Sequence, residues 1–311
     1  MRELRHALVL GGWGFIGSWL VNRLLEDGVE VTVLDRAAPE QPAPGPVRRI
    51  DAEVTQEAVE KFILQSPVDA VFQAAGAALV PPSLERPLED LEQNVVTTLA
   101  ALEGLRRARS DAVIVLLSSA AVYGDAQYHP MDENHPLEPK SPYGVAKLAA
   151  ERYLRLYSRL HGLRGFSVRP FSIYGPRQRK LVVFDLLTRL HAGEQPLRML
   201  GSPEVSRDFV FVEDAAHGLV ALARRADGAG EAYNLASGRS TSLHELATTL
   251  VDITGIEADV EFTGRVRAGD PLNWTGDPQR ARALGVCCDT PLDEGLRRTA
   301  EWFATTRAAA K

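Results

Sequence analysis

The two side chains of this sequence best suited to acid–base chemistry are Tyr143 and Lys147, which stand four positions apart. Ser141 and Pro142 precede them and suit the N-cap and the first position of a helix. A spacing of four then puts Tyr143 and Lys147 on one helix face. Because a nearby ammonium favours the phenolate, we predict that Tyr143 is a general acid–base group for interconverting an alcohol and a ketone. Without further motifs, the pair would equally suit a helix surface.

A glycine-rich turn, Gly11-Gly-Trp-Gly-Phe-Ile-Gly17, follows an apolar run and opens a helical pattern. Such a turn lets the backbone approach a pyrophosphate at a helix N-terminus, so it predicts a dinucleotide site. The residues assigned to that site here are Gly11, Gly14, Phe15, Ile16 and Gly17. A bound nicotinamide ring in its positively charged form would further favour the Tyr143 phenolate.

Asp35 follows Gly17 by 18 residues, at the end of a second apolar run. A carboxylate at this place accepts hydrogen bonds from the adenosine ribose and repels a 2′-phosphate, which favours NAD over NADP. The adjacent Arg36 is a cofactor-contact candidate that could instead hold such a phosphate. A third candidate is Ser119 in Ser118-Ser-Ala-Ala-Val-Tyr-Gly124, because its hydroxyl can bond a reacting oxygen. A serine here could also simply cap the following turn.

These candidates need elements to hold them, and the first 175 residues alternate short apolar runs with helical patterns. The runs cover 7–10, 29–34, 69–72, 112–117 and 165–169, and the helical windows cover 15–26, 55–65, 88–107 and 141–161. Continuous apolar strands alternating with helices predict an α/β fold, a doubly wound parallel sheet of the Rossmann type. Ser118 and Ser119, which follow the run 112–117, would then lie at the carboxyl edge of the sheet, where such folds bind ligands.

Beyond residue 175 the pattern changes to mixed short elements, with helices expected near 180–192, 214–225, 242–254 and 291–305. We predict an NAD-binding Rossmann domain over residues 1–175 and a smaller C-terminal α/β substrate-binding lobe over 176–311. A segment of about 207–228 is expected to return to the first domain.

Composition excludes several classes of protein. The 311 residues include 35 Lys and Arg against 41 Asp and Glu, a net charge of −6, which argues against a nucleic-acid-binding protein. No uncharged apolar stretch is long enough to span a membrane, and no spacing of Cys or His suits a metal, so neither a membrane nor a metal is expected. The adjacent Cys287 and Cys288 predict reduced thiols and a cytoplasmic protein.

Together, Gly11–Gly17, Ser118–Gly124 and the pair Tyr143 and Lys147 resemble the extended short-chain dehydrogenase/reductases, in particular their NAD-dependent sugar-nucleotide epimerase/dehydratase branch. The resemblance runs nearly end to end and implies NAD as cofactor and a nucleotide-diphosphate sugar, UDP- or dTDP-linked, as partner. It implies further cofactor contacts from Asp51, Ala74, Ala75, Gly76 and Phe171. It also implies substrate contacts from Ser119, Ser172, Arg207 and Arg267. The guanidinium groups of the two arginines suit a diphosphate.

The resemblance also bears on the reaction. Dehydratases of this branch usually carry acidic residues after the strand-five serine, and the related decarboxylases usually have Glu in place of Ala121. Here Ala120 and Ala121 follow Ser119. This favours a 4-epimerase, in which Tyr143 takes the 4-OH proton, Ser119 orients that oxygen and Lys147 holds the nicotinamide ribose and the phenolate.

Two other functions stay open. Ser172 stands where epimerases usually have Asn, Gln73 where they usually have His, and the loop after Gln178 is short and basic. These differences would also fit a 4-ketoreductase that uses NAD(P)H. A non-catalytic NAD-binding protein is the third possibility, because a fold does not fix a function.

The helices expected over 88–107 and 141–161 carry apolar residues around much of their circumference. Members of the family often dimerise through the corresponding helices, so a homodimer is expected. The same residues could instead be core that faces the sheet.

Overall fold

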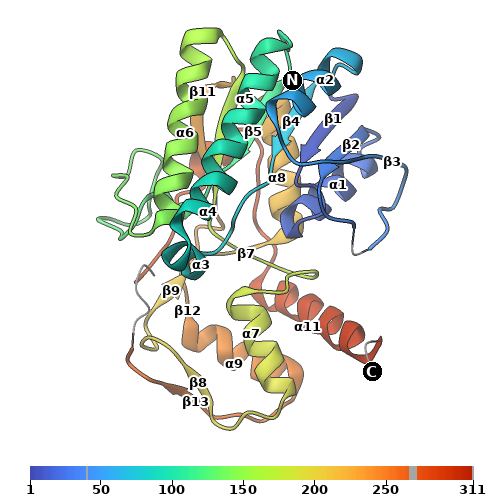
Figure 1. Cartoon of the computed structure of the whole chain (residues 1–311). Helices are drawn as coiled ribbons and strands as arrows, with labels where there is room; N and C mark the ends of the chain where they lie inside the picture. The colour runs from blue at the N-terminus through green and yellow to red at the C-terminus, as the bar shows by residue number, and fades with distance from the viewer. Residues whose placement is uncertain (40, 266–271, 310–311) are drawn as a thin grey trace.

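A seven-stranded sheet organises the computed structural model, which describes residues 1–39, 41–265 and 272–309 (Figure 1). The strands follow one another across the sheet as β3 (Val47–Asp51), β2 (Glu30–Asp35), β1 (His6–Leu10), β4 (Ala70–Gln73), β5 (Val113–Leu117), β6 (Gly165–Pro170) and β11 (Ala229–Leu235). Every neighbouring pair is parallel. The strand order reverses between β1 and β4, where a doubly wound sheet opens a crevice for ligands. The predicted Rossmann fold is confirmed.

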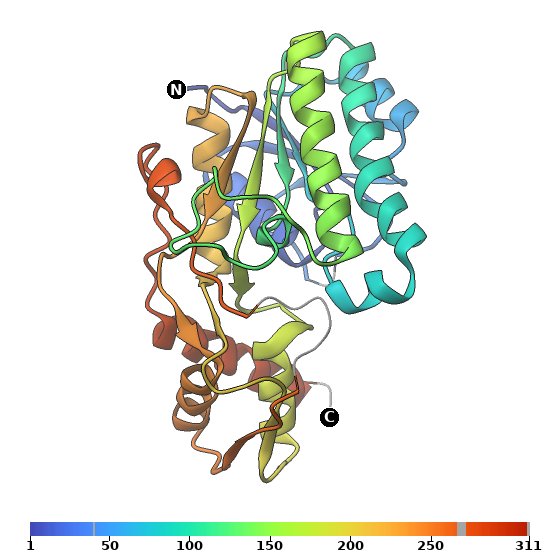
Figure 2. The ribbon, with the colours of Figure 1, turned by 90° about the vertical axis from the view of Figure 1, so that its left-hand side faces the viewer.

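Helices cover both faces of this sheet. The helices α1 (Phe15–Glu26) and α8 (Val212–Arg225) pack on one face, and α2 (Gln56–Gln65), α5 (Thr97–Arg107) and α6 (Pro142–His161) pack on the other. Alternate strand residues feed the two layers, for example Val115 in the first and Ile114 in the second. Burial on both sides explains why the central strands are continuous apolar runs. Figures 1 and 2 show α5 and α6 lying side by side.

Two strands of the sheet were not predicted. The edge strand β3 is largely exposed and carries charged residues, so it lacks an apolar run. The other edge strand, β11, begins with a glycine-containing bulge and keeps its fully buried residues for its second half. With β11, the chain's return to the sheet continues to Leu235, beyond residue 228 where the sequence placed its end.

A smaller lobe lies beyond the carboxyl ends of the strands (Figures 1 and 2). Its core joins three helices that bury apolar faces against one another. The elements of this half are β7 (Ser172–Tyr174), α7 (Leu181–His191), β8 (Leu197–Met199), β9 (Ser206–Arg207), β10 (Phe209–Phe211), β12 (Thr241–Ser242), α9 (Leu243–Thr254), β13 (Val260–Phe262), α10 (Gln279–Arg282) and α11 (Leu292–Ala309). The short strands pair as β7 with β10, β9 with β12 and β8 with β13. Cys287 and Cys288 are both free thiols.

Short helical segments follow the carboxyl ends of the two central strands. After β4 come α3 (Val80–Glu85), α4 (Pro87–Leu91) and the π-helical turn η1 (Glu92–Val96), which leads into α5. After β5 comes the single turn η2 (Ala120–Val122). None of the helices within the described ranges is long and apolar enough to cross a membrane.

Candidate active site

The glycine turn packs directly against the segment that follows β4. Gly11 has a φ of +76°, and a Cβ there would lie 2.6 Å from the backbone of Ala75. A Cβ on Gly17 would lie 2.3 Å from the Gly11 carbonyl oxygen. Gly14 differs, because a Cβ there would meet only that same oxygen, at 3.4 Å. The space beside Gly14 at the start of α1 is therefore open, as a pyrophosphate would require.

The candidates for the adenosine end lie at the ends of β2 and β3. Asp35 and Asp51 face each other in register on these two strands. The two Asp35 carboxylate oxygens accept the backbone N–H groups of Trp13, at 3.0 Å, and Ala37, at 2.9 Å. Each oxygen keeps a lone pair for a further donor, so Asp35 can fix the glycine turn and still bond a ribose hydroxyl. Arg36 is exposed.

Ser119, Tyr143 and Lys147 meet at the carboxyl end of β5. The Ser141 side chain caps α6 by accepting the N–H of the third helical residue, and this fixes where the helix begins. Tyr143 then lies in the first turn, buried and hydrogen-bonded through its side chain to Ser119. The Lys147 ammonium donates to the Leu117 carbonyl oxygen at 3.0 Å and lies 5.8 Å from the centre of the Tyr143 ring. The structure thus brings the three predicted catalytic residues together.

Burial controls the ionisation of this pair. Burial raises the pKa of Tyr143 to about 12. The hydrogen bond from Ser119 lowers this pKa, and the negative charge of Asp90 raises it further. Burial also lowers the pKa of Lys147 to about 8, against the attraction of Asp90 and Glu151. With the protein's own groups alone, burial therefore favours the protonated phenol of Tyr143. A further positive charge at the ring would be needed to form the phenolate.

Several buried polar atoms around this pair have no hydrogen-bond partner within the described part of the chain: Gln73 Oε1, Ser118 Oγ, Asn94 Oδ1 and Asp90 Oδ2. A Cβ on Gly76 would lie 2.6 Å from Asn94 Oδ1, so the segment after β4 also reaches this place. Unpaired buried polar atoms are costly and mark sites where a ligand or water supplies the missing bonds. We call Ser119, Tyr143, Lys147, Asp90 and Asn94 the Tyr143 cluster.

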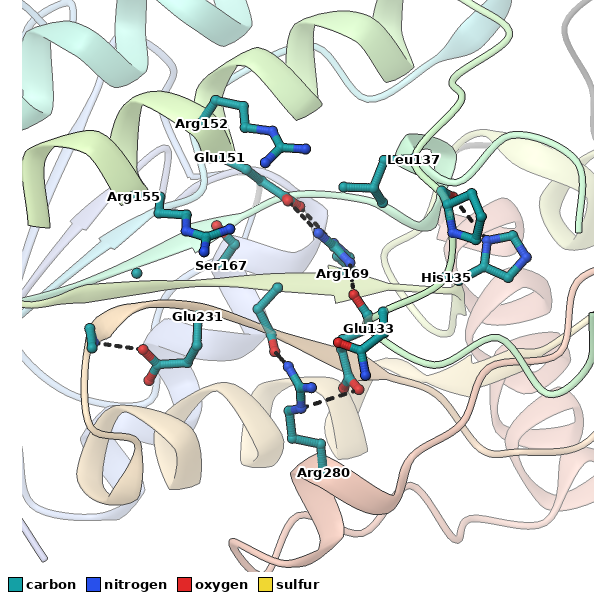
Figure 3. A pocket seen from close by; sticks show the side chains of 15 residues that line it. Glu133, His135, Leu137, Glu151, Arg152, Arg155, Ser167, Arg169, Glu231 and Arg280 are labelled. Carbon is teal, nitrogen blue, oxygen red and sulfur yellow. Dashed lines mark hydrogen bonds and ion pairs between the residues drawn. The ribbon is translucent and has the colours of Figure 1, made fainter. Parts of the chain in front are cut away.

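A second buried polar group lies further along α6, beside a cavity of about 570 Å³ (Figure 3). Arg169 on β6 donates to both oxygens of Glu151 on α6, at 2.9 and 2.7 Å. It also donates to the Tyr123 hydroxyl at 3.0 Å, and that hydroxyl donates to Asn234 at 2.6 Å. The Glu133 carboxylate accepts the backbone N–H of Asn234. We call these five residues the Arg169 cluster; it joins α6, β6 and β11 and so fixes the helix that carries the acid–base pair.

The candidates for the substrate side lie between the sheet and the lobe. Phe171 is buried between the end of β6 and β7, with its ring against Trp274. Ser172 begins β7 and is partly exposed. Arg207 on β9 donates to the carbonyl oxygen of Leu272 at 3.0 Å and lies over the Trp274 ring. Arg267 lies outside the described residues.

A cavity of about 360 Å³ opens at the start of α1. Its lining includes Trp13, Gly14 and Phe15 from the glycine turn, Arg177 from the segment after β7, and Trp302 from α11. Ile16, beside Phe15 in the first turn of α1, packs partly into the core. The cavity therefore joins the predicted pyrophosphate site to the lobe.

Two acidic residues of this site were not predicted from the sequence. Asp90 and Glu151 were not singled out, although Glu151 follows Lys147 at the next helical turn of the same face. That spacing of four was an available signal for Glu151. Asp90 had none, because its burial depends on how α4 packs against α6.

Comparison with known proteins decides the family. A model of the NAD dependent epimerase/dehydratase family matches residues 7–236. The chain belongs to this family. It is 33% identical over 310 residues to the UDP-glucose 4-epimerase of Mycolicibacterium smegmatis, covering 96% of this chain and 98% of that one.

Two further relatives widen the comparison. The chain is 30% identical over 319 residues to UDP-glucuronic acid decarboxylase 1 of Xenopus tropicalis, covering 97% of this chain and 73% of that one. Its fold matches the crystal structure of the UDP-glucose 4-epimerase of Thermus thermophilus in complex with NAD. The TM-score of that match is 0.88 at 30% identity, covering 96% of this chain and 99% of that one.

This enzyme is an NAD-dependent epimerase. Its own residues fit the cofactor, since the space beside Gly14 is open at a helix N-terminus and Asp35 retains free lone pairs at the end of β2. The unpaired Ser118 and Asn94 side-chain atoms lie further along, near Lys147. The individual contacts predicted from the sequence remain predictions.

Proposed function

We propose that this enzyme interconverts the C4 epimers of a nucleotide-diphosphate sugar, UDP- or dTDP-linked. The observation that carries the proposal is the buried Tyr143 hydroxyl, which is hydrogen-bonded to Ser119. The two residues that follow Ser119 in the sequence, Ala120 and Ala121, are apolar. An acid–base group is present for oxidation and reduction of an alcohol, while the segment after Ser119 offers no acid for dehydration. The two UDP-glucose 4-epimerases described above support this assignment.

NAD, when bound, supplies the group that takes a hydride from the sugar and later returns it. Tyr143 Oη accepts the proton of the 4-OH as C4 becomes a ketone, and Ser119 Oγ orients that oxygen. Lys147 stabilises the phenolate by its charge, and its ammonium would hold the nicotinamide ribose. After the keto sugar turns its other face, Tyr143 Oη gives the proton back, so the reaction consumes no second substrate.

The remaining candidates divide into two groups. We propose that Gly11, Gly14, Phe15, Ile16, Gly17, Asp35, Arg36, Asp51, Ala74, Ala75, Gly76 and Phe171 contact the cofactor. Arg207 and Arg267 are proposed to hold the diphosphate of the substrate, since guanidinium groups bind its oxygens in pairs. Ser172 is proposed to contact the nucleotide-sugar.

Turnover without added cofactor tests the reaction. Purified enzyme is incubated with UDP- and dTDP-linked hexoses and uronic acids, and the products are resolved by NMR. We expect each active substrate and its C4 epimer to reach the same mixture from either side. A reaction that proceeds only while NAD(P)H is added and consumed would assign a 4-ketoreductase instead. Carbon dioxide released from a uronic acid would assign a decarboxylase, the activity named for the Xenopus relative.

Tyr143→Phe tests the acid–base assignment, with Tyr128→Phe, an exposed tyrosine outside this cluster and outside the dimer surface proposed below, as the control. General acid–base catalysis contributes roughly 10²–10⁴-fold, so we expect Tyr143→Phe to slow epimerisation by about that factor. The control is expected to turn over at the wild-type rate. Wild-type turnover by Tyr143→Phe would rule the assignment out.

We also propose a homodimer formed by two copies of the α5–α6 side. The inward residues of these helices pack on the sheet, yet apolar side chains remain exposed on the outside: Leu88, Leu91 and Val96 before α5, and Val145, Tyr153, Leu156 and Leu160 on α6. An exposed apolar patch of this kind suits a self-association surface. Leu156→Glu with Leu160→Glu is expected to give a monomer by sedimentation, whereas Leu64→Glu on α2 is not. A wild-type monomer would contradict this proposal.

A further inference from the structure

Asp90 is a buried carboxylate in the active site that no step above uses. It lies on α4 with only 4% of its surface exposed. Its Oδ1 accepts a hydrogen bond from Asn94 Nδ2 at 3.2 Å, and within the described residues its Oδ2 has no partner. A carboxylate buried with an unpaired oxygen is costly, so a compensating positive charge nearby is expected.

The ammonium of Lys147 attracts this carboxylate. The helix α4 packs against α6, and the charge of Asp90 acts on both Lys147 and Tyr143. The one hydrogen bond that the ammonium makes within the described chain goes to Leu117, which leaves two of its three N–H groups without a protein acceptor. Asp90 and Lys147 are thus two incompletely bonded charges that stabilise each other.

The other charges facing Lys147 can be compared with Asp90. Glu151, one turn further along α6, also attracts the ammonium. However, both oxygens of Glu151 are bonded to Arg169, so its charge is largely balanced. Tyr143 is uncharged while its hydroxyl is protonated. Asp90 is therefore the main unbalanced negative charge acting on this lysine.

We propose that Asp90 is a positioning residue of this active site, whose buried carboxylate stabilises the ammonium of Lys147 beside Tyr143. This inference rests on the proposed acid–base role of Tyr143. The carboxylate acts through Lys147 and does not itself touch the substrate.

The direction of the effect follows from the charges. Without the carboxylate, the Lys147 ammonium loses an attraction, so the pKa of Lys147 falls below its value of about 8. The Tyr143 phenolate loses a repulsion, so the pKa of Tyr143 falls from about 12. A single nearby charge typically moves a pKa by about one unit or more. Both changes shift the pH dependence of activity toward acid.

The experiment compares Asp90→Asn with Asp90→Glu and with Glu89→Gln. Glu89 is a suitable control because it lies on the same helix but is largely exposed and paired with Arg86. The sequence holds only five lysines, so NMR of isotope-labelled lysine side chains can follow Lys147 directly. The second measurement is the pH dependence of kcat/KM.

We expect Asp90→Asn to lower the ionisation midpoint of Lys147 and the activity profile by about one pH unit. Asp90→Glu should restore most of the shift, and Glu89→Gln should cause none. An unchanged midpoint in folded Asp90→Asn, with only a lower kcat or Tm, would overturn the proposal. The NMR titration needs no turnover, so it tests Asp90 even if Tyr143→Phe proves active and the proposed function fails.

Discussion

The two buried polar clusters along α6 differ in how completely their atoms are bonded. In the Arg169 cluster the guanidinium donates to acceptors of the protein, Glu151 and Tyr123 among them. The Tyr123 hydroxyl donates in its turn to the side-chain amide of Asn234. In the Tyr143 cluster a carboxylate oxygen and an amide oxygen are buried without partners in the described part of the chain. The first arrangement stabilises the fold, whereas the second keeps bonding capacity for a ligand.

The difference has a structural cause. The Arg169 cluster lies between α6 and two strands, β6 and β11, so side chains surround it from several elements. The Tyr143 cluster lies at the carboxyl end of β5, on the edge of the sheet where doubly wound folds bind ligands. Both places bury polar groups, but only the second leaves buried polar atoms without partners in the described part of the chain.

The largest effect on stability is expected for the bonded cluster. Glu151→Gln leaves the Arg169 guanidinium buried beside a neutral amide, and breaking a buried pair in this way costs about 3–5 kcal/mol. We expect the free energy of unfolding, measured in urea, to fall by that amount. The double variant Glu151→Leu with Arg169→Met should lose less, because neither charge of the pair remains. A loss below about 1 kcal/mol in the single variant would show that the pair is not what holds α6 in place.

The Tyr143 cluster should instead reduce stability at neutral pH. The pKa of Lys147 is about 8 in the folded protein and 10.5 for an ordinary lysine, so the unfolded chain binds more protons between these values. Stability therefore rises with pH across this window, by on the order of 3 kcal/mol, and the cost of burying the ammonium is fully present below pH 8.

Urea unfolding of the wild type and of Lys147→Met between pH 7 and about 10.5 measures this contribution. The wild type is expected to gain stability relative to the variant as the pH rises. If the free energy of unfolding changes with pH in the same way in both proteins, burial of the Lys147 ammonium costs nothing measurable. The proposed difference in stability between the two clusters would then be wrong.

Much of this arrangement was predictable from local pattern. The central strands and long helices have apolar periodicities that do not depend on distant residues, and Tyr143 and Lys147 are joined by a fixed helical spacing. The edge strand β3 was not predicted because an edge strand is half exposed and lacks an apolar run. The strands β9 and β12 were not predicted because two-residue strands are defined only by their pairing.

The clusters themselves were only partly predictable. Ser119 meets Tyr143 because β5 ends and α6 begins at the same edge of the sheet, which the topology predicts. The burial of Asp90 and the pairing of Arg169 with Glu151 come from tertiary packing, which no spacing in the sequence encodes.

The smallest effects are expected in the glycine turn, where the same contrast between filled and open space recurs. A methyl group on Gly17 would meet the Gly11 oxygen at 2.3 Å and the Gly12 backbone at 2.9 Å, so the turn must shift. Such overpacking costs about 1–3 kcal/mol, and Gly17→Ala should lower Tm even without nucleotide. A methyl group on Gly14 meets no such obstacle, so Gly14→Ala should keep the wild-type Tm.

Gly14→Ala should instead affect the cofactor, because its methyl group would fill the open space at the start of α1. We expect NAD to bind about tenfold more weakly by calorimetry, equivalent to about 1.4 kcal/mol. Equal loss of Tm in both variants, with NAD affinity unchanged in Gly14→Ala, would mean that the space beside Gly14 is not a ligand site. The space beside Gly14 would then not indicate a ligand site in this enzyme. The unpaired polar atoms of the Tyr143 cluster would remain as the evidence for where small molecules bind.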